Sequence, residues 1–268
     1  MVAGEGQLSG WAVVLGASSG LGAACAVGLA RAGMDIVGVS LGRRQSRESA
    51  EATGAAIEAA GRRWWPIRAN AADERGRAKV LDAITPEIAP GGVRVLVHSL
   101  GFGSPVRFIG AGPSARGVPF ARQMEMTLDV MAHSLIYWTQ DLVGGELMGA
   151  GGRILAMSSH GSHRVLPGYG AVGTAKAALE ANVRELAVEL APSGIAVNAI
   201  RAGLTDTAAF RAIPTAHEMM ARVVATHPAG RVTTPEDVAG VVVALCSPGC
   251  AWLTGNTVSV DGGESIVG

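Results

Sequence analysis

Residues 11–22 read Trp-Ala-Val-Val-Leu-Gly-Ala-Ser-Ser-Gly-Leu-Gly, an apolar run of strand length that passes directly into a glycine-rich turn. Glycine permits a tight turn and a close approach of the backbone to a phosphate group. The N-terminus of the helical pattern that follows would attract the same anion. The spacing is Gly-x-x-x-Gly-x-Gly rather than Gly-x-Gly-x-x-Gly. Its place between a strand and a helix favours a nucleotide-binding turn over a purely structural one.

Short apolar runs alternate with longer helical patterns along the rest of the chain. We expect strands at 11–16, 35–40, 64–69, 93–99, 153–159, 195–203 and 256–262, and helices at 23–32, 47–60, 74–84, 121–148, 169–190 and 235–246. Most of the strands are apolar throughout, as parallel strands covered on both faces are. The alternation predicts an α/β protein with a doubly wound, parallel, seven-stranded sheet (Rossmann fold) in a single domain, residues 1–268. Ligands of such sheets bind outside the carboxyl ends of the strands, where we expect long loops at 101–118 and 205–215.

The composition limits the partners that we expect. The 22 basic and 22 acidic residues cancel, and no run of Lys or Arg is longer than two. This balance argues against a nucleic-acid partner and against an anionic membrane surface. Cys25, Cys246 and Cys250 show no metal-ligand or paired spacing, and no metal site is expected; we expect reduced thiols in a cytoplasmic protein. We also expect no signal peptide, and the apolar run at 238–246 is too short to span a bilayer.

The end of the second predicted strand bears on the choice of cofactor. An enzyme that uses NAD usually places an acidic residue there, on the ribose 2′-hydroxyl. This chain has Ser40, followed closely by Arg43 and Arg44, whose guanidinium groups can pair with a 2′-phosphate. The alternative is two solvated arginines in a loop. The missing acid and the two cations together favour NADP (NADPH).

Tyr169 and Lys176 are the candidate catalytic pair. They lie seven residues apart, close to two helical turns, so both should project from one face of the helix predicted at 169–190. We expect the ammonium group to lower the pKa of the phenol and make it a better proton donor. Of the 22 basic residues 20 are Arg, so the choice of Lys at this position points to chemistry rather than to surface charge.

Several segments together resemble the short-chain dehydrogenase/reductase family over nearly the whole chain. The matching pieces are residues 16–22, Ser159, the helix with Tyr169 and Lys176, residues 197–200 and residues 253–263. The usual Tyr-x-x-x-Lys of that family is absent, because Val172 stands four residues before Lys176. The Tyr-x₆-Lys spacing is similar instead to the enoyl-acyl-carrier-protein reductases of the family. Residues 98–102, His-Ser-Leu-Gly-Phe, and residues 169–180 are similar to the same branch.

Two further features of the chain refine this resemblance. The first enoyl reductase subtype has a second tyrosine where this chain has Ser159, and its glycine pattern is more open. The chain is therefore most similar to the NADPH-dependent subtype III. An asparagine that usually joins the proton relay of the family corresponds to Met131, which puts that relay in doubt. His98, if it points inward, is expected to be a packed residue rather than a catalyst.

The resemblance implies a site and a reaction. NADPH would deliver hydride to the C=C bond of an enoyl thioester, carried by acyl carrier protein or coenzyme A, in a cytoplasmic homotetramer that serves lipid metabolism such as fatty acid biosynthesis. Tyr169 and Lys176 would act in catalysis, and Ser159 would either bind substrate or satisfy local backbone groups. The implied cofactor-binding residues are Gly16, Ser18, Ser19, Gly20, Leu21, Ser40, Arg43, Arg44, Asn70, Ala71, Ser99, Leu100, Gly101, Lys176, Gly203, Leu204, Thr205 and Thr207.

Two other functions fit the same residues. One is reduction of a carbonyl group, in a ketone or a 3-oxoacyl thioester, by an enzyme of the same fold. The other is binding of NADP without turnover by a sensing or scaffold protein. The presence of both Tyr169 and Lys176 argues against the second alternative.

Overall fold

The computed structural model describes residues 8–103, 108–109, 120–166, 168–211 and 216–267. Seven parallel strands form one sheet in the order β3-β2-β1-β4-β5-β6-β7. This confirms the doubly wound sheet that the alternating pattern predicts. The strands are β1 (Trp11–Leu15), β2 (Asp35–Ser40), β3 (Trp64–Arg68), β4 (Val93–His98), β5 (Arg153–Ser159), β6 (Ala196–Ala202) and β7 (Thr257–Val260).

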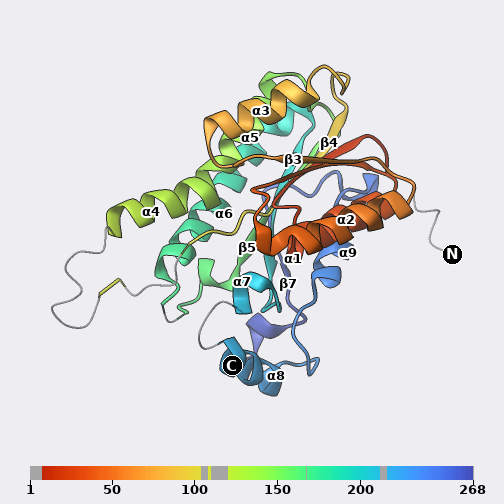
Figure 1. The fold of residues 1–268 in the computed structure, drawn as a ribbon. Coiled ribbons are helices and arrows are strands. Elements are labelled where there is room, and N and C mark those ends of the chain that lie inside the picture. The colour runs from red at the N-terminus through yellow and green to blue at the C-terminus, as the bar shows by residue number, and fades with distance from the viewer. Residues whose placement is uncertain (1–7, 104–107, 110–119, 167, 212–215, 268) are drawn as a thin grey trace.

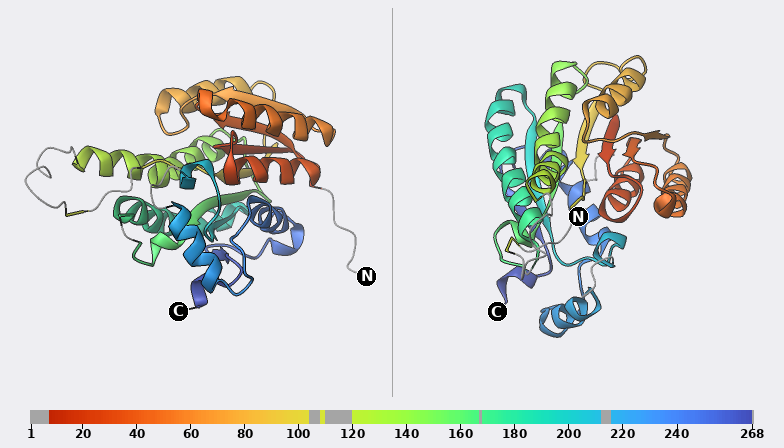
Figure 2. Two further views of the ribbon diagram at one scale, coloured as in Figure 1. Left: turned by 60° about the horizontal axis from the view of Figure 1, so that its bottom comes forward. Right: turned by 60° about the vertical axis from the view of Figure 1, so that its left-hand side comes forward.

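Helices cover both faces of the sheet, as Figures 1 and 2 show. One face packs against α1 (Gly20–Arg31), α2 (Arg47–Ala59) and α9 (Pro235–Leu245). The other face packs against α3 (Glu74–Ile84), α5 (Ser134–Gly144) and α6 (Gly170–Leu190), and α4 (Phe120–Leu128) contacts α6. Two short helices, α7 (Ala208–Arg211) and α8 (Ala216–Thr226), follow β6. In the described part of the chain, no helix is long and apolar enough to cross a membrane.

Local sequence explains where several helices begin and how closely they pack. The Asp73 carboxylate accepts a hydrogen bond of 2.6 Å from the Gly76 amide and caps α3. Thr234 and Asp237 form a reciprocal capping box at α9. A Cβ at Gly28 would lie 3.3 Å from the Ala239 Cβ, so this glycine lets α1 and α9 approach closely.

Three details differ from the sequence expectations. The helix predicted at 121–148 is divided, because a π-helical stretch at Asp129–His133 separates α4 from α5, and α5 ends at Gly144. The loop expected at 205–215 contains α7, and its residues 212–215 lie outside the described residues. The loop expected at 101–118 lies mostly outside them as well. Helix α8 was not predicted.

Trp138 joins the core to the loop that follows β3. Its side chain is fully buried on α5, and its indole Nε1–H donates a hydrogen bond of 2.7 Å to the Ala71 carbonyl oxygen. A buried carbonyl without a donor is costly, so this bond should hold Ala71 in place.

We expect Trp138→Phe to lower the free energy of unfolding by about 1–3 kcal/mol, because the Ala71 carbonyl loses its donor and a void is left. Urea denaturation would measure the change. Tyr137→Phe is the matched control, since Tyr137 is only half-buried and its ring, 4.9 Å from the Arg77 guanidinium carbon, is retained. Equal stability of Trp138→Phe and the wild type would contradict the prediction.

Candidate active site

One cavity of about 2070 Å³ runs along the carboxyl ends of the strands. The turns and loops that follow β1 to β6 all contribute to its wall, as the rule for doubly wound sheets predicts. Of the site residues predicted from the sequence, every one except Arg44 lines this cavity. The structure thus brings the predicted cofactor residues, Ser159, Tyr169 and Lys176 to a single place.

The glycine-rich turn after β1 forms one end of the cavity. Gly16 has φ +86°, and a Cβ there would lie 2.3 Å from the Ser99 carbonyl oxygen. A Cβ at Gly22 would lie 2.3 Å from the Gly16 carbonyl oxygen, so glycine is required at both positions. The Ser19 side chain makes no hydrogen bond to the start of α1. The first amides of α1 therefore remain available to an anion beside the turn.

Of the two arginines predicted to bind a 2′-phosphate, only one lies on the cavity wall. Ser40 and Arg43 line the cavity, whereas Arg44 begins a short 3₁₀ turn and is absent from the wall. A residue that sequence reasoning missed, Arg68, holds this loop: its Nε donates a hydrogen bond of 3.2 Å to the Leu41 carbonyl oxygen. Gly42, with φ +63°, leaves space for the Arg68 side chain.

Tyr169 immediately precedes α6, and its hydroxyl lies 3.4 Å from the Ser159 hydroxyl at the end of β5. Burial raises the pKa of Tyr169, and the hydrogen bond with Ser159 only partly opposes this effect. The expectation that Lys176 lowers this pKa was therefore wrong. The physical reason is that removal of the phenol from water disfavours the phenolate. Tyr169 keeps its proton and can donate a hydrogen bond.

Lys176 lies on α6 with only 5% of its surface exposed. Its ammonium group donates a hydrogen bond of 2.7 Å to the Met157 carbonyl oxygen and a longer one of 3.5 Å to the Leu100 carbonyl oxygen. Burial lowers its pKa from 10.5 to about 8, and nearby Glu180 opposes the shift only in part. Lys176 is therefore not a surface lysine.

The position that the usual family tyrosine would occupy holds a buried aliphatic side chain at the cavity wall. Val172 is 5% exposed and packs in a small cluster with Met131 and Ala175. Met131 itself lies in the π-helical stretch between α4 and α5. His98 is fully buried at the end of β4, and its Nε2 lies 2.8 Å from the Ser134 hydroxyl. It is a packed residue, as expected from the sequence.

Two cavity residues, His160 and Glu264, were not singled out in the sequence. Both line the cavity, and the His160 Nδ1 lies 3.3 Å from the Glu264 Oε1. No local spacing could have paired residues so distant in the chain. Residues 253–263, which include Asp261, were part of the family resemblance, but Glu264, directly after them, was not singled out.

A family model described as Enoyl-(Acyl carrier protein) reductase matches residues 16–265, nearly the whole chain. The chain belongs to this enoyl reductase family. It is an oxidoreductase with the short-chain dehydrogenase/reductase fold, and the family depends on a nicotinamide dinucleotide. The sequence resemblance to an enoyl reductase branch is therefore confirmed.

Individual relatives agree with this assignment. The chain is 31% identical over 257 residues to 1-cyclohexenylcarbonyl-CoA reductase of Streptomyces collinus, covering 95% of this chain and 86% of that protein. It is 36% identical over 179 residues to the NADH-dependent enoyl-[acyl-carrier-protein] reductase of Aquifex aeolicus, covering 66% of this chain and 64% of that protein. A crystal structure of the Aquifex aeolicus enzyme superposes with a TM-score of 0.82, at 26% identity, over 98% of this chain and 99% of that one. A putative short-chain alcohol dehydrogenase from Sinorhizobium meliloti also superposes with a TM-score of 0.82, at 29% identity, over 97% and 98% of the two chains.

The lowered pKa of Lys176 predicts a pH dependence of cofactor binding. Because burial favours the neutral amine, Lys176 should lose its charge as the pH rises through about 8. We expect the dissociation constant of the nicotinamide cofactor to rise over the same interval, measured by fluorescence titration from pH 6.5 to 9.5. Lys176→Arg should bind more weakly but without this inflection, because a guanidinium remains charged and has a different shape. An identical inflection in the wild type and in Lys176→Arg would show that a titratable group other than Lys176 causes the pH dependence.

Proposed function

We propose that this chain uses NADPH to reduce the C=C bond of an enoyl thioester, with Tyr169 as the hydrogen-bond donor to the thioester carbonyl. The placement of Tyr169 carries the proposal. Its hydroxyl lies in the cavity beside Ser159, while Val172, at the usual tyrosine position, also lines the cavity but offers no donor. The only other tyrosine of the chain, Tyr137, is absent from the cavity wall.

The chemistry of the two candidate reactions distinguishes them. Reduction of C=C places hydride on the β-carbon, so negative charge develops on the thioester oxygen as an enolate, and the final proton goes to the α-carbon. Reduction of C=O places hydride on the carbonyl carbon, and the oxygen itself must receive a proton. A phenol whose pKa is raised can still donate a hydrogen bond to an enolate oxygen, but it gives up its proton less readily. Tyr169 therefore suits the first reaction better.

We assign supporting roles to Ser159 and Lys176. Ser159 is positioned to orient the phenol of Tyr169 through their contact of 3.4 Å. Lys176 would hold the nicotinamide ribose with its ammonium group. The carbonyl oxygens of Met157 and Leu100 already stabilise the charge of that group. The cofactor itself supplies the hydride, and the glycine-rich turn would receive its pyrophosphate.

The carrier and the assembly are further parts of the proposal. The Streptomyces collinus relative is named for a CoA thioester and the Aquifex aeolicus relative for an acyl-carrier-protein thioester, so we propose an enoyl thioester of either carrier as substrate. The family resemblance supports a cytoplasmic homotetramer built from one domain per chain. Light scattering on the purified protein would test the tetramer.

The preference for NADPH rests on the loop after β2. Ser40 has no negative charge, so it cannot accept a hydrogen bond from the ribose 2′-hydroxyl as a carboxylate would. Arg43 lines the cavity beside it. The Aquifex aeolicus relative is named as NADH-dependent, so cofactor choice must be measured for this chain.

Arg43→Ala should raise the dissociation constant of NADPH about tenfold or more, because a charge-assisted contact with the 2′-phosphate is lost, and should leave NADH nearly unchanged. Arg44→Ala is the matched control: it removes the same charge from a neighbouring position that does not line the cavity. Isothermal titration with both cofactors would measure the effect. Equal weakening of NADPH and NADH by Arg43→Ala would contradict a role in reading the 2′-phosphate.

Tyr169→Phe should lower kcat by about 10²–10⁴-fold, the range expected when an oxyanion donor or acid is removed, while NADPH still binds. The assay follows NADPH absorbance with crotonyl-CoA and the corresponding acyl-carrier-protein thioester. Tyr137→Phe, which removes the hydroxyl of the other tyrosine, should leave kcat unchanged.

A 3-oxoacyl thioester should not be reduced in the same assay. Efficient reduction of that substrate without any reduction of crotonyl thioesters would replace the proposed activity with carbonyl reduction. Binding of NADPH without turnover of either substrate would favour the non-catalytic alternative. In both cases the fold and the family would stand.

A further inference from the structure

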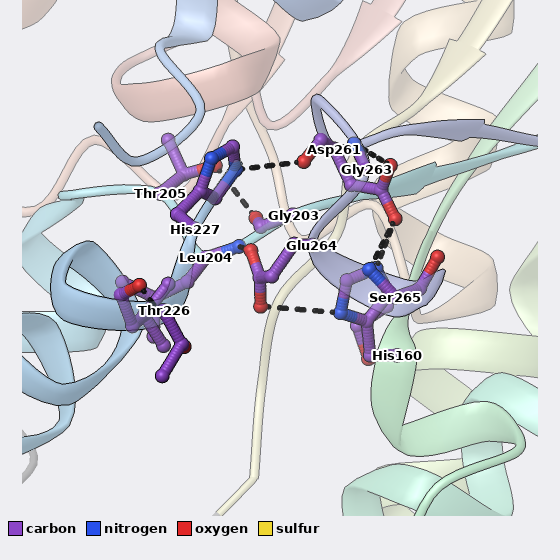
Figure 3. A network of polar contacts seen from close by, with 12 residues as sticks. His160, Gly203, Leu204, Thr205, Thr226, His227, Asp261, Gly263, Glu264 and Ser265 are labelled. Atoms are coloured by element: carbon purple, nitrogen blue, oxygen red, sulfur yellow. Dashed lines mark hydrogen bonds and ion pairs between the residues drawn. The ribbon is translucent and has the colours of Figure 1, made fainter. Parts of the chain in front are cut away.

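A buried network of polar groups connects the end of β5 to the end of the chain (Figure 3). His160, directly after Ser159, is 6% exposed. Its Nε2 lies 3.0 Å from the Asp261 Oδ2, and its Nδ1 lies 3.3 Å from the Glu264 Oε1. One imidazole ring thus bridges two carboxylates that follow β7.

Both carboxyl groups of this bridge are held in their ionised form. A neutral imidazole has a single N–H and can donate to only one of two carboxylates, whereas an imidazolium donates to both. Burial raises the pKa of the Glu264 carboxyl, but hydrogen bonds from His160 and the Leu204 amide outweigh it and leave the pKa below its ordinary value. In Asp261, hydrogen bonds from Ser265 and Gly263 outweigh burial in the same way. Each ring nitrogen of His160 therefore contacts one ionised carboxylate.

The second carboxylate oxygen of Glu264 contacts the backbone of Leu204, a residue that lines the cavity. The Glu264 Oε2 accepts a hydrogen bond of 2.8 Å from the Leu204 amide. The Leu204 carbonyl oxygen accepts one of 3.1 Å from the Thr233 amide. The backbone at Leu204 is therefore held from both sides, and Leu204, Thr205 and Thr207 line the cavity.

We propose that His160 is a positioning residue, whose imidazole ring holds the Glu264 carboxylate against the Leu204 amide and so fixes residues 203–207 for cofactor binding. Both ring nitrogens of His160 face carboxylates, so neither is free to donate to a substrate. His160 acts through Glu264 rather than on the reacting atoms. The inference rests on the proposed function, because it takes residues 203–207 to be part of the cofactor site.

A double-mutant cycle separates this role from a general effect on stability. The variants are His160→Ala, Glu264→Ala and the combination of the two. His217→Ala is the matched control, since His217 is an exposed histidine on α8 that is not among the residues lining the cavity. The readouts are the dissociation constant of NADPH, kcat at saturating NADPH, the melting temperature, and hydrogen–deuterium exchange at the Leu204 amide.

We expect each single variant to weaken NADPH binding about tenfold, the effect of losing a hydrogen bond to a charged group. The double variant should bind no more weakly than Glu264→Ala, because the two residues act in series. The Leu204 amide should exchange faster in all three variants, and kcat should stay within about twofold of the wild type. His217→Ala should match the wild type in every readout.

Wild-type affinity together with wild-type exchange at Leu204 in His160→Ala would overturn the inference. Additive losses in the double variant would also overturn it, since the residues would then act independently. If His160→Ala fails to fold, His160→Gln replaces it. The single amide nitrogen of Gln cannot take the places of both ring nitrogens. The affinity for NADPH and the protection of the Leu204 amide from exchange should then lie between those of the wild type and Glu264→Ala. A wild-type protein that binds neither NADPH nor NADH would instead refute the proposed function, and the inference with it.

Discussion

The site is organised around the burial of one ammonium group at the carboxyl edge of the sheet. A buried charge is tolerated only when it is paired or hydrogen-bonded, and Lys176 meets this requirement through the carbonyl oxygens of Met157 and Leu100. These partners belong to β5 and to the loop after β4, two neighbouring strands of the sheet. The charge therefore fixes where the first turns of α6 lie over the sheet. Tyr169, at the start of that helix, is placed over the same edge.

A largely buried ion pair between Glu180 and Arg201 supports this placement. Glu180, one turn after Lys176 on α6, accepts hydrogen bonds of 2.6 Å from the Ser158 hydroxyl and 2.8 Å from the Arg201 guanidinium. These contacts tie α6 to β5 and β6, beside the strand end that carries Ser159. The His160 network continues the connection to the end of the chain and back to Leu204. The part of the site around Tyr169 and Lys176 and the part around Leu204 are thus connected by charged side chains and backbone groups.

The sequence predicted the sheet and most of the site because both depend on local patterns. Short strand-like runs, most of them apolar throughout, locate all seven strands, and the spacing of Tyr169 and Lys176 locates the helix that carries both side chains. The π-helical stretch at Asp129–His133 escaped prediction, since one extra residue in a turn scarcely changes the apolar periodicity. The separation of Arg43 from Arg44 depends on a short 3₁₀ turn that adjacent arginines do not signal.

Long-range polar contacts were beyond the reach of the sequence. His160 and Asp261 are 101 positions apart, and only the fold brings them to 3.0 Å. The pKa of Tyr169 was predicted in the wrong direction for a related reason. The sequence shows that a lysine is near, but it does not show that burial outweighs the charge and that the lysine bonds to backbone oxygens instead.

The destination of the hydride tests the central claim most directly. The protein would be incubated with NADPH deuterated at C4 of the nicotinamide ring, together with crotonyl-CoA in one sample and acetoacetyl-CoA in another, and NMR would locate the deuterium in the products. We predict deuterium on the β-carbon of butyryl-CoA and none transferred to acetoacetyl-CoA. Deuterium on the hydroxyl-bearing carbon of 3-hydroxybutyryl-CoA, with crotonyl-CoA left unchanged, would contradict the account.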